Sequence, residues 1–341
     1  MAPKVTIIWI NFNSMHIWSY IEKSLKAITS LEYPDYEIIL IDNGSSDGSR
    51  EAIEEWLRRQ KIRVPVKFIK LKRNLGFTGA ANIAYRYRDK SAKYVALVNN
   101  DAIPNENFLS ILIEYLEEHK DIGAIQGIIT RMNNGKEIID SAGGFLDELL
   151  FSKIFHENEP VNRINAITYV TYVEGAMPIY RVNAIEKAMG DRGLFISEAF
   201  VYWLEDCLLG LRLWNCSYKS VTLPKVVGCH YRRVTIKKYS RSINISYFSL
   251  RNWFAFWIIT NSRFKLVLPL VMLIFQLKKV FKKEKGYLPS VLTTNISNPA
   301  DFIRWLIKAL VDGLRLGMRL KKDMGLVDIY KAPILRNLHK I

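Results

Sequence analysis

Residues 37–50 read EIILIDNGSSDGSR, an apolar run that stops at Asp42 and gives way to turn-forming and polar residues. A short run rich in Ile is typical of a strand that is buried on both faces of a parallel sheet. Apolar residues then recur at helical spacing over 50–60, and Asp47 stands where a helix cap is expected. Strand, polar loop and helix together predict one repeating unit of an α/β fold.

The same unit recurs on both sides of this stretch. Strands are predicted at 5–10, 37–41, 66–71 and 94–98, and helices over 20–29, 50–60 and 79–88. A β-α-β series of this kind predicts a parallel sheet with right-handed crossovers. Ligands of such sheets bind beyond the carboxyl ends of the strands, so the segments that directly follow the strands are the candidates for a functional site.

Four of these segments carry side chains suited to a nucleotide. They are Asn11-Phe12-Asn13-Ser14, the run from Asp42 to Ser49, the run from Lys72 to Gly79, and Asn99-Asn100-Asp101. A carboxylate in the second can accept from a base N–H or a ribose hydroxyl, and the glycines of the third let backbone N–H groups approach phosphate. Asp101 suits a hard divalent cation shared with phosphate oxygens. Each segment by itself is also compatible with an ordinary turn, a helix cap or tight packing.

Several other classes of protein are excluded or disfavoured. No G-x-x-x-x-G-K-[ST] occurs, which excludes a P-loop NTPase, and no G-x-G-x-x-G follows the first strand, which argues against a dinucleotide dehydrogenase. Cys207, Cys216 and Cys229 match neither a disulfide framework nor a zinc pattern. The N-terminus shows no signal-peptide apolar region, so a reducing cytoplasmic setting is expected.

Taken in order, the motifs of the chain resemble those of the family 2 glycosyltransferases over residues 4 to about 232. The matching positions are Asn11-Phe12-Asn13, Asp42-Asn43-Gly44-Ser45-Ser46-Asp47-Gly48, Asn74-x-Gly76, Gly79-x-x-Asn82, Asn99-Asn100-Asp101, Glu174-Gly175-Ala176, Arg181, Gly193-Leu194-Phe195, Tyr202-Trp203-Leu204-Glu205-Asp206, Leu211-Arg212-Leu213 and His230. The resemblance implies an inverting enzyme with the GT-A fold, which is a Rossmann-like mixed sheet with helices on both faces.

The resemblance also implies a role for individual residues. The nucleotide-sugar site would comprise Phe12, Asn13, Asp42, Asn43, Asn74, Gly76, Asn99 and Asn100. Asp101, with His230, would hold a divalent metal, Mg²⁺ or Mn²⁺. Asn99 and Asn100 depart from the family's D-x-D pattern, in which the first position is an acid, and this leaves the contact to the ribose open.

Glu205-Asp206 matches the acidic pair of the family. Inversion in a single displacement needs a carboxylate that takes the proton of the acceptor hydroxyl. We assign this role to Asp206, the orientation of the acceptor to Glu205, and stacking on an acceptor sugar to Trp203. The structural alternatives are two acids favoured by a helix N-terminus and an aromatic residue of the core.

The net charge of +16 is concentrated at one end of the chain. Residues 1–230 carry 27 basic and 28 acidic residues, net −1, whereas residues 231–341 carry 22 and 5, net +17. This division, with a length of 341 residues, predicts a catalytic domain over 1–235 and a C-terminal helical region over 236–341. Apolar runs between the basic residues favour lipid over nucleic acid as the partner of that region.

The C-terminal region is predicted to bind a membrane surface. A hydrophobic segment over 252–277 is interrupted by Arg263, Lys265 and Pro269, so a single clean span is disfavoured. Over 301–322, apolar residues at three- and four-residue spacing alternate with Lys and Arg, which predicts an amphipathic basic helix in contact with anionic lipid. The alternative is a helix packed on the catalytic domain with a solvated basic face.

The expected function is therefore sugar transfer by a monotopic enzyme at the cytoplasmic face of the membrane. The donor would be GDP-mannose or a UDP-sugar, which includes a mannosyltransferase among the candidates, and the acceptor a hydroxyl of a lipid-linked glycan. The alternatives are a soluble glycosyltransferase acting on protein or polysaccharide, a nucleotidyltransferase, and a non-catalytic nucleotide-sugar binder at the membrane. Donor base and acceptor are open at this level.

Overall fold

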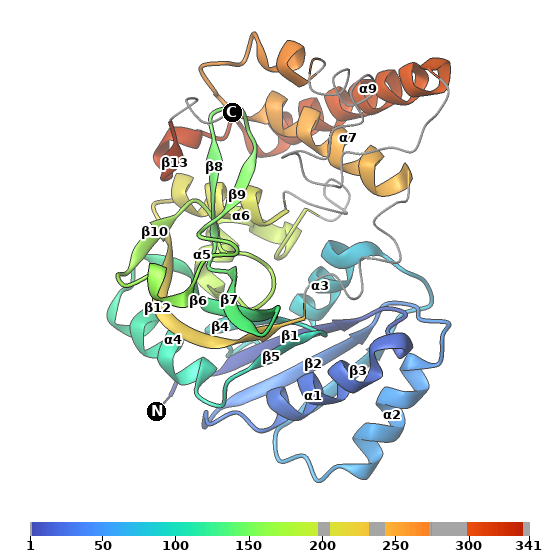
Figure 1. Cartoon of the computed structure of the whole chain (residues 1–341), viewed down its shortest axis with the longest axis vertical. Helices are drawn as coiled ribbons and strands as arrows, with labels where there is room; N and C mark the ends of the chain where they lie inside the picture. Colours follow the sequence, from blue (N-terminus) through green and yellow to red (C-terminus); the bar gives the residue numbers. More distant parts are fainter. Residues whose placement is uncertain (1, 197–204, 232–242, 273, 275–298, 337–341) are drawn as a thin grey trace.

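The computed structural model describes residues 2–196, 205–231, 243–272, 274 and 299–336. Its centre is a mixed sheet in the order β10-β12-β6-β11-β4-β1-β2-β3, with β5 paired to β12 and β7 paired to β6 (Figure 1). The parallel part consists of β1 (Val5–Asn11), β2 (Tyr36–Asp42), β3 (Val66–Lys70) and β4 (Tyr94–Asn99). These strands confirm the four that the apolar runs predict.

The second part of the sheet contains antiparallel pairs. It is built from β5 (Ala102–Pro104), β6 (Ile122–Asn133), β7 (Lys136–Ser141), β10 (Thr168–Val170), β11 (Ile179–Arg181) and β12 (Lys219–His230). β11 runs antiparallel between β4 and β6, and β12 pairs in parallel with β6 and antiparallel with β5. Through its pairing with β5, the C-terminal end of β12 lies close to the end of β4.

Helices cover both faces of the sheet, as expected for this fold class. One core joins β1 and β2 to α1 (Trp18–Thr29), α2 (Ser49–Arg59) and α4 (Phe108–Glu118). The core on the opposite face contains α3 (Gly76–Arg86), α5 (Val182–Met189) and α6 (Glu205–Asn215). Because side chains of a strand alternate in direction, Ile8 faces the second core and its neighbours Ile7 and Trp9 face the first.

The C-terminal helices extend the second core. α7 (Ile243–Ile259) and α9 (Pro299–Met324) lie side by side at one end of the molecule (Figure 1). Two glycines of α9 allow the close approach: a Cβ at Gly313 would lie 2.6 Å from the carbonyl oxygen of Arg251, and one at Gly317 would lie 2.6 Å from Cβ of Ile258. The predicted amphipathic helix is thus present, and one of its faces packs against protein.

Further contacts join this end to the rest of the chain. A small second sheet has the order β13-β8-β9, in which β13 (Ile334–Leu335) pairs in parallel with β8 (Gly144–Asp147), and β9 (Ser152–Ile154) completes it. Arg263 forms an ion pair with buried Glu148 at 2.7 Å. One continuous core therefore contains residues from both sides of the domain boundary that the sequence predicts at residue 235. Among the described residues, no helix is both long and apolar enough to cross a membrane.

Candidate active site

The ends of three neighbouring strands lie in register at the carboxyl edge of the sheet. Asn11 at the end of β1 is opposite Asp42 at the end of β2, and Ile10 is opposite Asn99 at the end of β4. The loops that follow these strands therefore meet at one edge, as the sequence predicts. This edge is the candidate active site.

Asp42 is fully buried and its carboxylate is bound within the protein. One oxygen accepts from Asn11 Nδ2 at 2.9 Å, and the other accepts from the backbone N–H of Ser45 at 3.1 Å and from Arg50 Nε at 2.9 Å. These contacts shape the loop after β2 around the carboxylate. A direct contact of Asp42 with the nucleotide stays a prediction.

Asn13 joins the loop after β1 to the loop after β2. Its φ of 46° lies in the left-handed region, which Asn tolerates better than most residues. Its backbone N–H donates to Ser45 Oγ at 3.0 Å, and its Oδ1 accepts from the N–H of Ser46 at 2.8 Å. Phe12, beside it, is half-buried. Asp47 accepts from the N–H of Ser49, the first residue of α2, although Gly48 occupies the N-cap position.

Asn43 joins the same loop to the one after β3. Its Nδ2 donates to Asn74 Oδ1 at 3.0 Å and to the carbonyl of Gly76 at 3.1 Å, and its Oδ1 accepts from the N–H of Leu75 at 2.9 Å. Asn43, Asn74 and Gly76, which the sequence assigns to one pocket, are thus brought together by direct hydrogen bonds.

We predict that Gly44→Ala lowers the free energy of unfolding by more than the strain of an alanine in a left-handed backbone conformation. Gly44 has φ of +77°, and a Cβ there would lie 2.5 Å from the backbone carbon of Arg73. Gly135→Ala is the matched control, because Gly135 has φ of +76° and nothing within 4 Å. Both variants carry the left-handed strain of roughly 1 kcal/mol, and Gly44→Ala adds an overlap that costs about 1–3 kcal/mol more. Urea unfolding of both variants measures the difference, and equal midpoints would contradict it.

Asp101 and His230 are in contact although 129 residues separate them. The antiparallel pairing of β12 with β5 places His230 opposite Ala102, directly after Asp101. His230 Nε2 lies 3.0 Å from Asp101 Oδ1, and Nδ1 lies 2.9 Å from Asp140 Oδ2. Burial by itself would lower the pKa of His230, but the Asp101 and Asp140 carboxylates raise it to about 10.

The donor atoms of this pair fit a divalent cation. Neighbouring ligands of an octahedral ion at about 2.1 Å are about 3.0 Å apart, and Asp101 Oδ1 and His230 Nε2 show this separation. Within the described part of the chain no group of three or more His, Cys, Asp or Glu is arranged to hold a metal. The pair therefore suits an ion that takes its remaining ligands from phosphate and water, as Mg²⁺ commonly does.

Glu205 and Asp206 begin α6 and approach the end of β4 through one short segment. Asp206 Oδ2 accepts from the backbone N–H of Gly175 at 3.0 Å, and the carbonyl of the next residue, Ala176, accepts from the N–H of Asn99 at 3.0 Å. The acidic pair and the Asn99-Asn100-Asp101 loop are thereby connected through two adjacent residues.

The surroundings of the acidic pair favour the protonated forms. Burial raises the pKa of Glu205 to about 7. Burial, together with the carboxylates of Glu205 and Glu174, raises the pKa of Asp206 well above its usual range. Carboxyls with raised pKa values are typical of groups that exchange protons near neutral pH. Trp203 lies outside the described residues, so its role toward the acceptor stays a prediction.

Two residues of this region have contacts in the structure to which the sequence analysis assigned no role. Asp140, at the end of a strand, gives no local signal because its partner His230 is distant in the chain. Asn82 is part of a quoted motif, and the structure shows what it does: Oδ1 accepts from the N–H of Phe195 at 2.8 Å and Nδ2 donates to its carbonyl at 2.6 Å. Gly193 fits beside it, since a Cβ there would lie 3.1 Å from Asn82 Oδ1.

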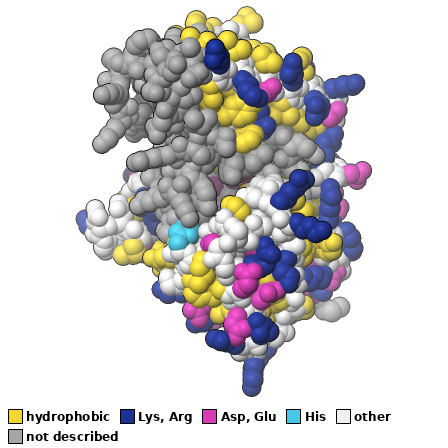
Figure 2. Space-filling view, turned by 90° about the vertical axis from the view of Figure 1, so that its right-hand side faces the viewer, with side chains coloured by type: hydrophobic (Ala, Val, Ile, Leu, Met, Phe, Trp, Pro, Cys, Tyr) yellow, Lys and Arg dark blue, Asp and Glu magenta, His cyan; other side chains and the backbone are white. Residues whose placement is uncertain are grey.

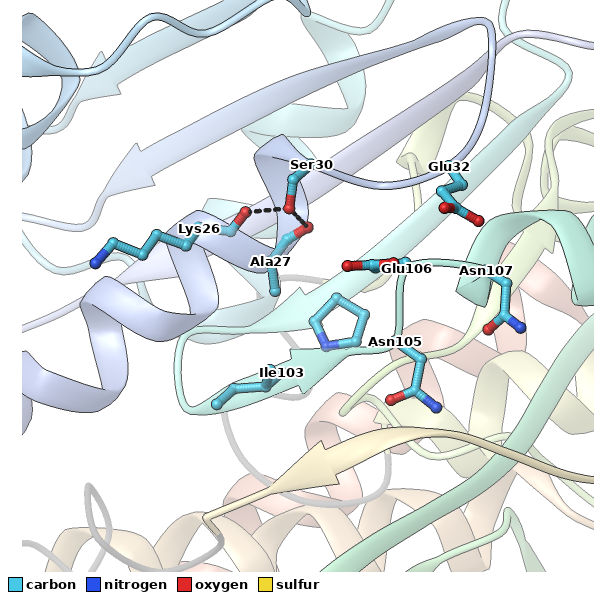
Figure 3. Close-up of a pocket in the computed structure, with 9 residues that line it drawn as sticks. Lys26, Ala27, Ser30, Glu32, Ile103, Asn105, Glu106 and Asn107 are labelled. Carbon is cyan, nitrogen blue, oxygen red and sulfur yellow. Dashed lines mark hydrogen bonds between the residues drawn. The ribbon is translucent and has the colours of Figure 1, made fainter.

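One depression of the described surface lies elsewhere and carries none of this chemistry. It has a volume of about 640 Å³ and is lined by residues of the α1 C-terminus and of the segment after β5, including Lys26, Glu32, Pro104 and Asn105 (Figure 3). None of the candidate site residues lines it. The functional edge of the sheet is defined by its side-chain chemistry rather than by this depression.

A GT-A-type mixed sheet with acidic loops at its carboxyl edge defines the class of protein: an α/β nucleotide-binding fold. The family model described as "Glycosyl transferase family 2" matches residues 6–177, about half of the chain. The chain therefore belongs to glycosyl transferase family 2, which confirms the resemblance seen in the motifs.

Curated relatives match the N-terminal part. The chain is 31% identical over 107 residues to a poly-beta-1,6-N-acetyl-D-glucosamine synthase of Staphylococcus epidermidis, covering 31% of this chain and 24% of that protein. It is 32% identical over 124 residues to an uncharacterized glycosyltransferase of Haemophilus influenzae, covering 36% of each. The matches thus span about a quarter to a third of these relatives.

Solved structures show the same fold at low identity. The mannosyltransferase PcManGT of Pyrobaculum calidifontis, in complex with GDP-Man and Mn²⁺, is 16% identical with a TM-score of 0.53, covering 93% of this chain and 88% of that chain. GalNAc-T7 with UDP, GalNAc and Mn²⁺ is 14% identical with a TM-score of 0.62, covering 95% and 58%. These likenesses concern the fold.

Proposed function

We propose that this protein transfers a sugar, with inversion, from a nucleoside diphosphate donor to an acceptor hydroxyl. The observation that carries the proposal is the hydrogen-bonded connection of the Glu205-Asp206 pair, through Gly175 and Ala176, to the loop of Asp101. A proton acceptor and a pair of side chains suited to a cation, at one sheet edge, suit a single displacement. The acceptor oxygen attacks the anomeric carbon, the bond to the diphosphate breaks, and Asp206 takes the hydroxyl proton.

A divalent cation, Mg²⁺ or Mn²⁺, would be held by Asp101 and His230. Their 3.0 Å separation supports this, as do the Mn²⁺ complexes of the two structural neighbours. When bound, the cation supplies positive charge to the departing diphosphate. Nucleotide recognition falls to the loops joined by Asn13 and Asn43, and orientation of the acceptor to Glu205 and Trp203.

The donor is tested with a panel of sugar nucleotides. GDP-Man occurs in the complex of one structural neighbour and UDP with GalNAc in that of the other, so GDP-mannose and UDP-linked sugars are the first candidates. Thermal shift with Mn²⁺ selects the donors that bind, and donor hydrolysis and transfer to lipid-linked and free glycan acceptors follow. No hydrolysis and no transfer of any bound donor would favour the non-catalytic binder instead.

Activity is expected to fall as the pH decreases through 7. Burial raises the pKa of Glu205 to about 7 and the pKa of Asp206, the assigned base, well above its usual range, so the pair takes up a proton as the pH falls toward 7. Below it, kcat/KM should decrease about tenfold per pH unit, because the base is protonated. Steady-state rates from pH 5 to 9 measure this, with donor binding followed at the same pH values as a control. A flat profile with intact donor binding would remove the pair from the proton transfer.

We further propose that the enzyme works at a membrane surface, through the outward face of α9. Four-residue spacing puts Ile303, Ile307 and Val311 on one stripe of this helix, and Ile303 and Ile307 are each 54% exposed. The opposite side, with Trp305 and Ala309, is buried against the protein. Among the described residues, the apolar stripe therefore lies on the more exposed side of α9.

Basic residues border this stripe. Arg304 is exposed beside this stripe, and Arg315, Arg319 and Lys322 are exposed on the turns of α9 that follow it. Lys and Arg stand beside hydrophobic side chains at the end of the molecule that carries α7 and α9 (Figure 2). Apolar side chains flanked by cations complement an anionic lipid surface, which supports a lipid-linked acceptor.

A second exposed apolar group adjoins the end of α9. Leu266 is 95% exposed, and Leu270 near it is exposed as well. The segment that precedes Leu266 contacts the segment that follows α9: Thr260 pairs with Val327, and the N–H of Arg263 donates to the Tyr330 hydroxyl at 2.8 Å. The helix and the loop would thus touch lipid together.

Vesicle flotation is expected to detect this contact. The protein should float with vesicles that contain phosphatidylglycerol, less with phosphatidylcholine alone, and less at high salt. Replacing Ile303 and Ile307 by Ser should weaken flotation by about tenfold or more, because each buried Ile contributes on the order of 1.5–3 kcal/mol. Met132→Ser, at an exposed apolar residue of β6, is the control. A different outcome would favour the soluble enzyme with an oligomerising tail: the unaltered protein does not float with vesicles but forms dimers in solution, and the Ser variants are monomeric.

A further inference from the structure

We infer that Asp140 orients the imidazole of His230 so that the Nε2 atom of His230 and the Oδ1 atom of Asp101 can bind one divalent cation together. Asp140 thereby sets the affinity of the site for that cation. The inference rests on the proposed function, since it concerns the ion that Asp101 and His230 would hold. It adds a positioning residue that no motif of the chain marks.

The geometry that carries the inference is a line of three side chains. Asp140 Oδ2 lies 2.9 Å from His230 Nδ1, and His230 Nε2 lies 3.0 Å from Asp101 Oδ1. All three side chains are at most 8% exposed. With Nδ1–H donating to Asp140, Nε2 faces Asp101, and a cation that displaces the Nε2 proton would be shared between the two side chains.

Asp140 is itself held in place. Arg131 Nε lies 3.1 Å from Asp140 Oδ1, and β7, which carries Asp140, pairs with β6, which carries Arg131. Asp140 lies at an irregularity of this pairing, between Ile139 opposite Thr130 and Ser141 opposite Ile129. The positive charge of Arg131 offsets part of the desolvation cost of the buried Asp140 carboxylate. The Asp140 carboxylate is thus held by its ion pair with Arg131 and by its place in a strand rather than in a loop.

The same arrangement accounts for the position of β7 beside the site. β12 brings His230 to the end of β4 by pairing with β5, and β6 lies between β12 and β7 in the sheet. Asp140 therefore reaches His230 from two strands away. A carboxylate behind a metal-binding imidazole typically changes metal affinity by 10–100-fold when it is removed.

Mn²⁺ binding by the full chain tests the inference, with free Mn²⁺ followed by electron paramagnetic resonance and no nucleotide present. Asp140→Ala is expected to weaken Mn²⁺ binding by about 10–100-fold. Asp140→Asn keeps an acceptor for the Nδ1–H and should recover part of this loss; it is also nearly isosteric, so it serves if the Ala variant does not fold. Glu148→Gln is the matched control, because Glu148 is another buried carboxylate paired with an arginine, Arg263.

A double-mutant cycle separates positioning from general structural damage. In the His230→Ala background, Asp140→Ala should produce no further loss of Mn²⁺ affinity, because Asp140 acts through His230. Three results would each overturn the inference. Asp140→Ala could leave Mn²⁺ binding unchanged, or it could weaken Mn²⁺ binding as much in the His230→Ala background as in the unaltered protein. The third is that the unaltered protein does not bind Mn²⁺. Mn²⁺ binding that depends on Asp140, without sugar transfer from any donor, would instead count against the proposed function.

Discussion

Asp206→Asn should reduce sugar transfer by about 10³-fold or more while donor binding persists. The amide cannot take the proton of the acceptor hydroxyl, and a positioned base contributes about 10²–10⁴-fold. Asn retains an oxygen that can accept from the Gly175 N–H, now at 3.0 Å from Asp206 Oδ2, so the site geometry should survive. Single-turnover transfer and thermal shift with the donor measure the two effects separately.

The same variant should be more stable than the unaltered protein. A carboxyl whose pKa is higher in the folded than in the unfolded state destabilises the fold once the pH exceeds its unfolded value. Burial and the carboxylates of Glu205 and Glu174 raise the pKa of Asp206, so this cost is present at pH 8 and is lost toward pH 4. We expect a melting temperature higher by about 2–4 °C at pH 8 for each kcal/mol gained, and no difference near pH 4.

Asp147→Asn controls for the loss of any buried acid. Burial also raises the pKa of Asp147, but its carboxylate accepts from the backbone N–H groups of Leu149 and Phe151 in the turn after β8. Transfer by this variant should stay within a few-fold of normal. Near-normal turnover by Asp206→Asn would remove Asp206 from the mechanism and leave Glu205 as the candidate base.

Asp101→Asn should reduce metal-dependent transfer by about 10²–10³-fold. An amide is a weaker ligand for Mg²⁺ or Mn²⁺ than a carboxylate, and a cation at a departing diphosphate contributes several kcal/mol to the rate. Stabilisation by nucleoside diphosphate should also lose its dependence on Mn²⁺, whereas stabilisation without metal should be unaffected. Titrations of Mn²⁺ in transfer and thermal-shift assays measure both.

The control for this variant is a surface acid of the same size. Asp121→Asn removes an exposed carboxylate that pairs with Lys219 at 2.7 Å, and it should change neither quantity. If Asp101→Asn retained Mn²⁺-dependent transfer at the normal rate, the cation would have to be held by other groups, and the role of His230 would fall with that of Asp101.

Much of the fold and part of the site were accessible from local patterns. The apolar runs placed β1, β2, β3 and β4 within about one residue of their observed ends. β1, β2 and β4 are buried on both faces and need such runs, whereas β3 is a partly exposed strand at the edge of the sheet. The loops after these strands meet at one edge because parallel strands end on the same side. The antiparallel strands β10 and β11 have three residues each, too short for a period to be read.

The C-terminal region shows where such patterns stop being sufficient. A helical apolar stripe states that one face avoids water, but not what covers it. In α9 the side with Gly313 and Gly317 packs on α7, while Ile303 and Ile307 face outward. The predicted helix exists, and the tertiary structure alone divides its surface between a protein-facing and a free side.

The sequence by itself determined the family, the α/β fold and the chemistry of the strand-end loops, since these follow from residue types and short-range periodicity. Only the tertiary structure decided which distant groups meet. His230 lies 129 residues from Asp101 and 90 from Asp140, and no local spacing links them. Their contact arises because β12 and β7 join a sheet whose pairing is long-range, and the hydrogen bonds of that sheet fix the positions of the side chains.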